Sequence, residues 1–292
     1  LAHTTDRRKG VVASIRALDI NPVKNKAVLI KPNFNTADSA PGSTHNDTLM
    51  ALVDELWAMG ASTISLGERS YSPTREVMEE KGIIPLLEQK EIHIIDFDQL
   101  TEADWVKFDH PNLNWKSGFR VARPIHEAEC LVSTCCLKTH QFGGVITMAL
   151  KNSVGIVPTF RNGFDYMNEL HTSPQQQALI AEINMAFSPH LVVMDGVDAF
   201  VDGGPATGKR VRADVVVATT DRVANDAVGT AILKSLGSNT DIMNRKIFEQ
   251  VQIERAVELG IGVASAAEIE LVAADKASQT YVDQINAIVM QG

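Results

Sequence analysis

The residues best suited to chemistry are gathered in one stretch of the chain, from Cys130 to His171. An apolar run there ends in Lys138, Thr139 and His140, and Lys151 follows after two glycines. Lysine supplies positive charge and imidazole titrates near neutral pH, so this stretch is suited to binding an anion and moving a proton. Ligands of α/β proteins bind beyond the carboxyl ends of strands, where these residues would lie if the apolar run is a strand.

The candidate catalytic residues are His140, Lys151 and Lys138. Neighbouring glycines would let backbone N–H groups approach a bound anion closely. The candidate ligand-binding residues are Lys31, Asn33, Thr44, Glu68, Gly143, Gly144, Thr147, Asn152, Asp195 and Gly204. Each of these residues also has a structural interpretation. A lysine, for example, often lies on a solvated face. The glycine-rich loop 203–208 is either a phosphate-binding loop, a lid or a turn.

Metal binding is a second chemistry open to the central stretch. His140 and His171 are the candidate ligands, because neutral imidazole is a common metal ligand. The cysteines, Cys130, Cys135 and Cys136, lie in the apolar run, where cysteine usually behaves as a small hydrophobe. Consecutive strand residues point to opposite faces of a sheet, so Cys135 and Cys136 are poor joint ligands. Three thiols are too few for an iron–sulfur cluster held by four.

Composition and charge exclude several classes of function. The chain has 292 residues, 45% of them hydrophobic and 22% charged, which is ordinary for a globular protein. A net charge of −9 argues against nucleic acid or an anionic membrane as the general partner. No apolar run reaches the roughly 18 residues of a membrane span, and three cysteines indicate a reducing compartment, so we expect a cytoplasmic protein. Leu1 is not an initiator methionine, which leaves N-terminal processing open.

The elements that must position these residues alternate between strands and helices. This alternation predicts an α/β protein with a mainly parallel, doubly wound sheet. Strands are expected at 27–30, 62–68, 92–97, 130–137, 190–196, 213–221 and 270–273, and helices at 6–18, 46–60, 74–89, 173–187, 223–236 and 241–259. A short antiparallel excursion is expected over 104–122. We expect one domain over 1–292, with two lobes divided near 104–122 or 188 as the alternative.

Four of the expected strands end in polar residues, which begin at Lys31, Gly67, Lys138 and Asp195. In one parallel sheet these four ends would meet at a single edge and form a pocket. The alternative is that every strand must end in something polar. Neither GxxxxGK[ST] nor GxGxxG is present, so the usual ATP and NAD fingerprints are missing.

Taken together, these residues resemble the domain-of-unknown-function family 362. The matching motifs are Lys31-Pro32-Asn33, Lys138-Thr139-His140, Thr147 with Leu150-Lys151-Asn152, Gly155, Pro158, His171, Asp195-Gly196, and Gly204-Pro205 with Gly208. The resemblance spans about residues 27–226. It implies an iron–sulfur association, because many members carry an attached ferredoxin-like segment. This chain departs from that pattern, since it has no cysteine-rich segment.

A shorter similarity, over 140–171, is to the nickel-pincer lactate racemase family. In that family a histidine-containing turn precedes a lysine that carries a pyridinium-derived cofactor, and a later histidine ligates nickel. The similarity implies that Lys151 is the attachment lysine, His171 a nickel ligand and His140 an acid or base. No counterpart of that family's second acid–base histidine or its substrate-binding arginine is identified.

The leading hypothesis is an enzyme acting on a small anionic substrate, a carboxylate or a phosphate. Lys31, Lys138 and Lys151 would hold its negative charge, because a carbanion or enolate beside a carboxylate needs cationic stabilisation. His140 would move a proton, beside a transition metal or metal-containing cofactor held with His171. Isomerase, lyase and oxidoreductase chemistry all fit. The alternatives are a non-catalytic carrier of a metal, a cluster or an anionic cofactor with a ferredoxin-like redox partner, or a purely structural crossover.

Overall fold

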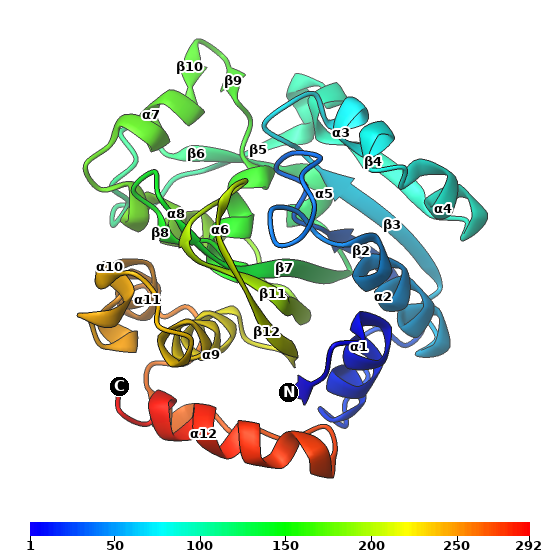
Figure 1. The fold of residues 1–292 in the computed structure, drawn as a ribbon. Helices are drawn as coiled ribbons and strands as arrows, with labels where there is room; N and C mark the ends of the chain where they lie inside the picture. The colour runs from blue at the N-terminus through cyan, green and yellow to red at the C-terminus, as the bar shows by residue number, and fades with distance from the viewer.

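The computed structural model describes residues 1–292 and is built on one eight-stranded sheet (Figure 1). Along the sheet, the strands are β1 (Ala2–His3), β12 (Gly208–Thr219), β11 (Leu191–Gly203), β7 (Cys130–His140), β2 (Ala27–Lys31), β3 (Thr63–Glu68) and β4 (His93–Asp96), and β8 (Val145–Ile146) pairs with β7. The five strands from β11 to β4 are mutually parallel, whereas β12 and β1 add antiparallel pairs at one side. The mainly parallel α/β sheet is therefore confirmed.

Helices cover both faces of this sheet. The helices are α1 (Arg7–Arg16), α2 (Asn46–Ala58), α3 (Thr74–Glu80), α4 (Ile84–Gln89), α5 (Arg123–His126), α6 (Ala149–Asn152), α7 (Tyr166–Thr172), α8 (Gln176–Ile183), α9 (Arg222–Ser235), α10 (Thr240–Met243), α11 (Val251–Glu258) and α12 (Gln279–Val289). Two antiparallel hairpins, β5 (Trp105–Phe108) with β6 (Phe119–Ala122) and β9 (Phe160–Arg161) with β10 (Phe164–Asp165), complete the fold. The first of these is the antiparallel excursion expected over 104–122. None of the helices combines the length and the hydrophobicity needed to span a membrane.

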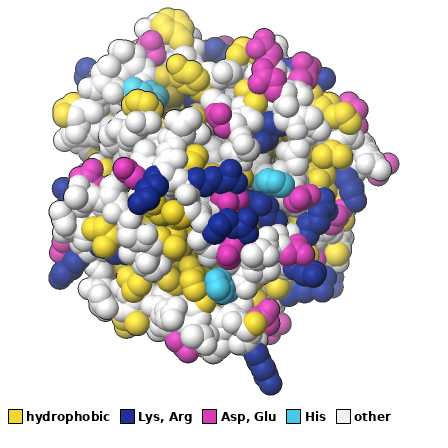
Figure 2. All heavy atoms as spheres, in the orientation of Figure 1, with side chains coloured by type: hydrophobic (Ala, Val, Ile, Leu, Met, Phe, Trp, Pro, Cys, Tyr) yellow, Lys and Arg dark blue, Asp and Glu magenta, His cyan; other side chains and the backbone are white.

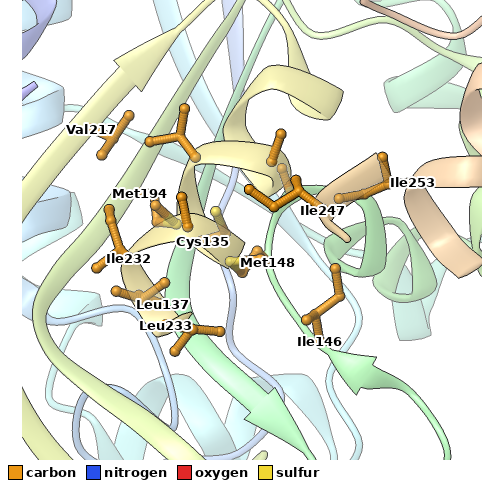
Figure 3. Packing of buried hydrophobic residues seen from close by; sticks show 14 of the residues in the cluster. Cys135, Leu137, Ile146, Met148, Met194, Val217, Ile232, Leu233, Ile247 and Ile253 are labelled. Atoms are coloured by element: carbon orange, nitrogen blue, oxygen red, sulfur yellow. The ribbon is translucent and has the colours of Figure 1, made fainter. Parts of the chain in front are cut away.

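Successive side chains of the central strands point to opposite faces of the sheet and pack into different hydrophobic cores, as the two-residue period of a strand requires. Cys130 and Val132 of β7 pack with α1–α4, whereas Cys135 and Leu137 pack with α9, α11 and α12. Figure 3 shows Cys135 and Leu137 among Met148, Met194 and Ile232 of the second core. A third core, beneath α7 and α8, includes Leu131. Because β7 is buried on both faces, its sequence does not alternate between apolar and polar residues, and its polar residues, among them Ser133 and Thr134, are buried as well.

Three predicted elements differ from the structure. The helix expected over 74–89 is broken into α3 and α4, because Gly82 has a φ of +61° and Pro85 begins the next helix. The helix expected over 241–259 is likewise divided into α10, a 3₁₀ turn at Ile247–Glu249 and α11. Residues 270–273 form no strand, since β1 already occupies that edge of the sheet and Val272 bonds only to the amino terminus of Leu1.

An aspartate caps each of two long helices. Asp6 caps α1 and Asp221 caps α9, since a side-chain oxygen of each accepts from N–H groups of the first turn. The helix expected over 173–187 begins later, at Gln176, after a turn. Asp221 accepts from the N–H groups of Val223 and Ala224, and its second oxygen accepts from Val263. Asp221 therefore joins two segments as well as starting a helix.

We expect Asp221→Ala to destabilise the protein by about 2 kcal/mol, the upper part of the range for a lost N-cap, because three N–H groups lose their acceptor. The exposed cap Asp6 accepts one such bond, from Lys9, so Asp6→Ala is the matched control and should cost less. Urea unfolding of both variants measures the difference. Equal losses in the two variants would contradict a special role for Asp221.

Candidate functional site

The strands β2, β3, β7 and β11 run parallel, and the carboxyl ends of the first three lie at one edge of the sheet, as predicted. Asp195 lies beside this edge but does not end its strand, because β11 continues to Gly203, so the strand end predicted at Asp195 is wrong. Lys31 is in register with Ser133, and Asp195 with Cys136, so the polar ends of the parallel strands are adjacent. We call this edge, with the loops that follow the four strands, the strand-end rim. In the view of Figure 2, Lys and Arg side chains gather near the middle of the face together with a histidine.

Lys31 and Glu68 form a buried ion pair at the rim. The Lys31 Nζ lies 2.5 Å from the Glu68 Oε1, and both side chains are almost wholly buried. Burial lowers the pKa of Lys31 and raises that of Glu68, and the ion pair opposes both shifts. Glu68 also accepts from the N–H groups of Phe34 and Arg69, each at 2.9 Å. The charge of Lys31 is therefore already balanced within the protein.

Asn152 and Gly155 fit closely around that pair. The Asn152 Oδ1 accepts from the Lys31 Nζ at 3.4 Å, and its Nδ2 donates to the Ser133 Oγ at 3.0 Å. A Cβ on Gly155 would lie only 2.6 Å from the Glu68 Oε1, so no other residue fits without displacing the pair. These contacts hold α6 and the turn after it against the ends of β2 and β7.

Lys138 is buried without a carboxylate partner. Its Nζ donates to the Asn33 Oδ1 at 2.9 Å and to the carbonyl oxygen of Gly42. Thr44 supports this arrangement, because its Oγ1 accepts from the Asn33 N–H. Burial lowers the pKa of Lys138. It thus donates hydrogen bonds only to neutral oxygen atoms of the loop after β2, and Asp38 offsets part of its charge from a greater distance.

Lys151 is half-buried and has neither a hydrogen bond nor an ion pair with the protein. Burial, and after it the charge of Lys138, lowers the pKa of Lys151 to about 8. The structure brings Lys151 to His140 across Gly144. A Cβ on Gly144 would lie 2.9 Å from the Lys151 Cε and 3.0 Å from the His140 Nδ1. Glycine at this position is what allows the two side chains to lie so close together.

His140 is a neutral imidazole. Burial, followed by the charges of Lys151, Lys138 and His171, lowers its pKa to about 2. Its Nδ1 accepts from the Phe142 N–H at 3.2 Å, so the ring proton is on Nε2. His140 therefore offers an N–H donor at neutral pH and carries no charge there.

The candidate metal ligands His140 and His171 are not joined by a third protein ligand. His171 is exposed on α7, with its Nδ1 2.7 Å from the Met167 carbonyl oxygen. No group of three His, Cys, Asp or Glu side chains able to hold a metal ion is found. Cys135 and Cys136 point to opposite sides of β7, and burial raises the pKa of both thiols. The side chains by themselves therefore do not supply the four ligands of an iron–sulfur cluster. A metal held mainly by a bound cofactor would need fewer protein ligands.

Asp195 is engaged in an ion pair that the sequence did not indicate. Its Oδ2 lies 2.8 Å from the Arg7 Nε and accepts from the Thr48 Oγ1 at 2.6 Å. Arg7 also pairs with Asp198 at 2.6 Å. Arg7 stands in the first turn of α1, far from the central motif, and no local pattern points to it. Asp195 consequently fastens α1 to the sheet instead of presenting a free carboxylate.

Lys81 is a further rim residue that the sequence analysis missed. It follows α3, is half-buried, and lies 5.1 Å from the centre of the Phe34 ring. Burial lowers its pKa, with Cys136, Asp38 and Lys138 near enough to contribute. Lys81 has no ion pair, so it adds to the positive charge around Lys138. Nothing in its local sequence distinguishes it from a surface lysine.

The remaining predicted residues, Gly143, Thr147 and Gly204, also have structural roles. Gly143 has a φ of +78°, and the Thr147 N–H donates to the Lys138 carbonyl oxygen at 3.1 Å. A Cβ on Gly204 would lie 2.1 Å from the Thr139 carbonyl oxygen. The tip of the β11–β12 hairpin therefore lies directly against the end of β7. Of the three interpretations of loop 203–208, a tight turn is the one that its packing explains.

Asp226, which is wholly buried on α9, caps the helix that carries Lys151. Its carboxylate accepts from the N–H groups of Ala149 and Leu150, at 2.8 and 3.1 Å, and from the Asn225 side chain. Burial raises the pKa of Asp226 to about 6. Asp226 faces neither the rim nor solvent directly, and it positions the rim from inside the core.

Comparison with known proteins places the chain in a family. A family model described as a domain of unknown function, DUF362, matches residues 28–231. The chain belongs to this family. The resemblance seen in the motifs is thereby confirmed, and the matched range contains every strand of the rim.

Two individual proteins are similar to this member of DUF362. One, from Synechocystis sp., is described as thylakoid-associated and is 26% identical over 213 residues, which cover 71% of this chain and 63% of that protein. The chain thus spans less than two thirds of that relative's length. The other is the lactate racemase apoprotein from Thermoanaerobacterium thermosaccharolyticum, with 15% identity and a TM-score of 0.47. That match covers 75% of this chain and 53% of the racemase chain.

Asp226 makes stability depend on pH. Its pKa is raised on folding, so its favourable contribution is complete below about pH 4 and is lost as pH rises through about 6. Between pH 4 and pH 7, we expect the free energy of unfolding of wild type to fall by on the order of 2–3 kcal/mol more than that of Asp226→Asn. Any cost of the substitution that does not vary with pH leaves this difference unchanged. Urea unfolding at a series of pH values measures this. A difference that does not change with pH would contradict the assignment.

The charge of Lys138 is expected to lower the pKa of Lys151. Lys138→Met should therefore move the ionisation midpoint of Lys151 upward from about 8, because one neighbouring positive charge is gone. Competitive acetylation with acetic anhydride across pH, read by peptide mass spectrometry, gives that midpoint. Lys24→Met, at an exposed position before β2, is the control. An unchanged midpoint in Lys138→Met would rule out the coupling.

Proposed function

We propose that this DUF362 domain is an enzyme that binds a small anionic substrate, a carboxylate or a phosphate, at the strand-end rim. The observation that carries the proposal is an excess of positive charge there. Lys31 and Arg7 form ion pairs with carboxylates, whereas Lys138, Lys151 and Lys81 form none. Asp38 offsets part of the charge of Lys138 and Lys81 from a greater distance. Burying charge without a partner is costly, and an anionic ligand would supply the missing partner. The net charge of −9 makes this local excess more notable.

His140 would act on the substrate as a neutral hydrogen-bond donor. An imidazole with a pKa near 2 does not serve as an imidazolium acid at neutral pH, so we refine its expected role as a proton carrier. Its Nε2–H can instead donate to an oxygen atom on which negative charge develops. Reactions that form a carbanion or enolate beside an anionic group suit such a site. Isomerase, lyase and oxidoreductase chemistry all include such reactions.

The carrier alternative is supported less well by the geometry. A metal or iron–sulfur carrier would need a ligand set, and His140 with His171 supplies only two imidazoles. An anionic organic molecule would still fit the excess of positive charge. Catalysis is favoured over simple carriage by the amine of Lys151, which lies beside a neutral imidazole and makes no structural contact.

Anion binding is testable without knowledge of the substrate. We expect phosphate, acetate or oxalate to raise the unfolding temperature of wild type, since a ligand at 100 times its Kd stabilises by about 2.7 kcal/mol. Lys151→Met should reduce this effect, because methionine has a side chain of similar length but carries no positive charge. Lys24→Met should retain it. Equal thermal shifts in wild type and Lys151→Met would argue against binding at this rim.

The variant His140→Ala should affect anion binding and turnover differently. Because His140 is neutral, its removal should leave the anion-dependent thermal shift nearly unchanged. Turnover of any substrate found by screening small carboxylates and phosphates should fall, by on the order of 10²-fold, as for a lost oxyanion donor. Turnover equal to wild type in His140→Ala would remove His140 from the mechanism.

A further inference from the structure

Lys151 differs from the other lysines of the rim in having a free amine. Lys31 is paired with Glu68, and Lys138 donates to Asn33 and to the carbonyl oxygen of Gly42. Lys151 donates to no protein atom, although α6 is held firmly by Asn152 and by the Asp226 cap. Its side chain is half-buried, so it is partly shielded from water and is still accessible to a ligand. A fixed helix thus presents an amine that the fold itself does not use.

The surroundings of this amine favour its uncharged form. No carboxylate pairs with it. Burial, and after it the positive charge of Lys138, lowers the pKa of Lys151 to about 8. A lysine that served only as a point charge would be better placed beside a carboxylate. An amine that is partly neutral near physiological pH is instead a nucleophile.

The neighbouring groups would assist attack on a carbonyl carbon. The Lys151 Cε and the His140 Nδ1 both lie within 3.0 Å of the point where a Gly144 Cβ would stand. The Nδ1 of His140 is taken by the Phe142 N–H, which leaves the Nε2–H free to donate. The His140 ring and the Lys151 side chain thus flank the same glycine. Together, the Nε2–H and the amine would suit a carbonyl group, whose carbon takes the nucleophile and whose oxygen takes the hydrogen bond.

We propose that Lys151 forms an imine with the carbonyl group of a substrate that also carries a carboxylate or a phosphate. The inference rests on the proposed function and names its substrate class, oxo acids and phosphorylated aldehydes or ketones. The neutral Nζ adds to the carbonyl carbon, and a new C–N bond forms as the C=O π bond becomes an alkoxide. His140 donates a hydrogen bond to that oxygen. Proton transfer from nitrogen to oxygen gives a carbinolamine, which loses one water to give the imine.

The imine would explain why the site combines an anion-binding charge with a nucleophile. A protonated imine withdraws electrons from the adjacent carbon, so a carbanion formed there is stabilised. The substrate's anionic group would lie against the remaining positive charge of Lys81 and Lys138. No oxidant, reductant or metal is needed for imine formation itself. Hydrolysis of the imine returns the free amine and the carbonyl compound.

Reductive trapping tests this proposal on the whole chain. The protein is incubated at pH 8 with sodium cyanoborohydride and one probe: pyruvate, dihydroxyacetone phosphate or uncharged acetone. The reductant converts an imine into a stable secondary amine, which peptide mass spectrometry locates. We expect an adduct on Lys151 with pyruvate or dihydroxyacetone phosphate, and on the order of tenfold less with acetone. The better anionic probe identifies the carboxylate or the phosphate class.

Three variants make the test specific. Lys151→Arg keeps the positive charge and removes the nucleophile, so it should retain the anion-dependent thermal shift and lose the adduct. Lys24→Met should trap as wild type does. His140→Ala should trap more slowly while it binds anions normally. In wild type, the trapping rate should rise with pH around a midpoint near 8.

The outcomes separate this inference from the proposed function. A thermal shift with anions but no adduct on Lys151, or an adduct spread equally over exposed lysines, overturns the imine and leaves anion binding intact. If the protein shows no thermal shift with anions and no adduct on Lys151, both the imine and the proposed anion binding are overturned. An adduct that persists elsewhere in Lys151→Arg at the wild-type level also overturns the assignment to Lys151.

Discussion

The buried ion pair of Lys31 with Glu68 is the interaction around which the rim is built. It joins the ends of two neighbouring parallel strands, and its atoms dictate the residues that surround it. Asn152 must be an amide that serves both the pair and Ser133, and Gly155 must lack a side chain. A buried pair is worth little as net stability, but removing one partner leaves a buried charge and is costly. The pair thus fixes geometry more than it adds stability.

The balance of charge around this pair sets the electrostatic character of the site. Carboxylates that the sequence suggested for ligands, Glu68 and Asp195, are used to neutralise Lys31 and Arg7. What remains is positive charge without an ion-pair partner. Burial, and after it this charge, lowers the pKa of Lys151 and of His140. The buried, unpaired lysines therefore account for the neutral imidazole and underlie the proposed anion binding and the proposed reactivity of the amine.

The chemistry of the rim also depends on groups that never touch it. Asp226 lies in the core behind α6 and satisfies the first N–H groups of that helix, which is too short to be stable alone. Asp195 and Arg7 hold α1 against the sheet on the other side. Both carboxylates are distant in sequence from the residues they position. Such support is a property of the packed chain and leaves no local pattern by which it could be recognised.

The amino-acid sequence was sufficient to predict the parallel sheet, the meeting of polar strand ends at Lys31, Gly67 and Lys138, and the family, because apolar period, turn residues and motif spacing are local properties. It placed Asp195 at a strand end, whereas pairing with β12 extends β11 to Gly203. It also singled out Lys151 and His140. Only the tertiary structure decided which charges are free: Lys31 is paired, Lys138 is buried among neutral oxygens, and Lys81 joins the rim from a distant helix. Ionisation depends on burial and on charges brought close by folding. That information lies in the packing and not in the order of residues.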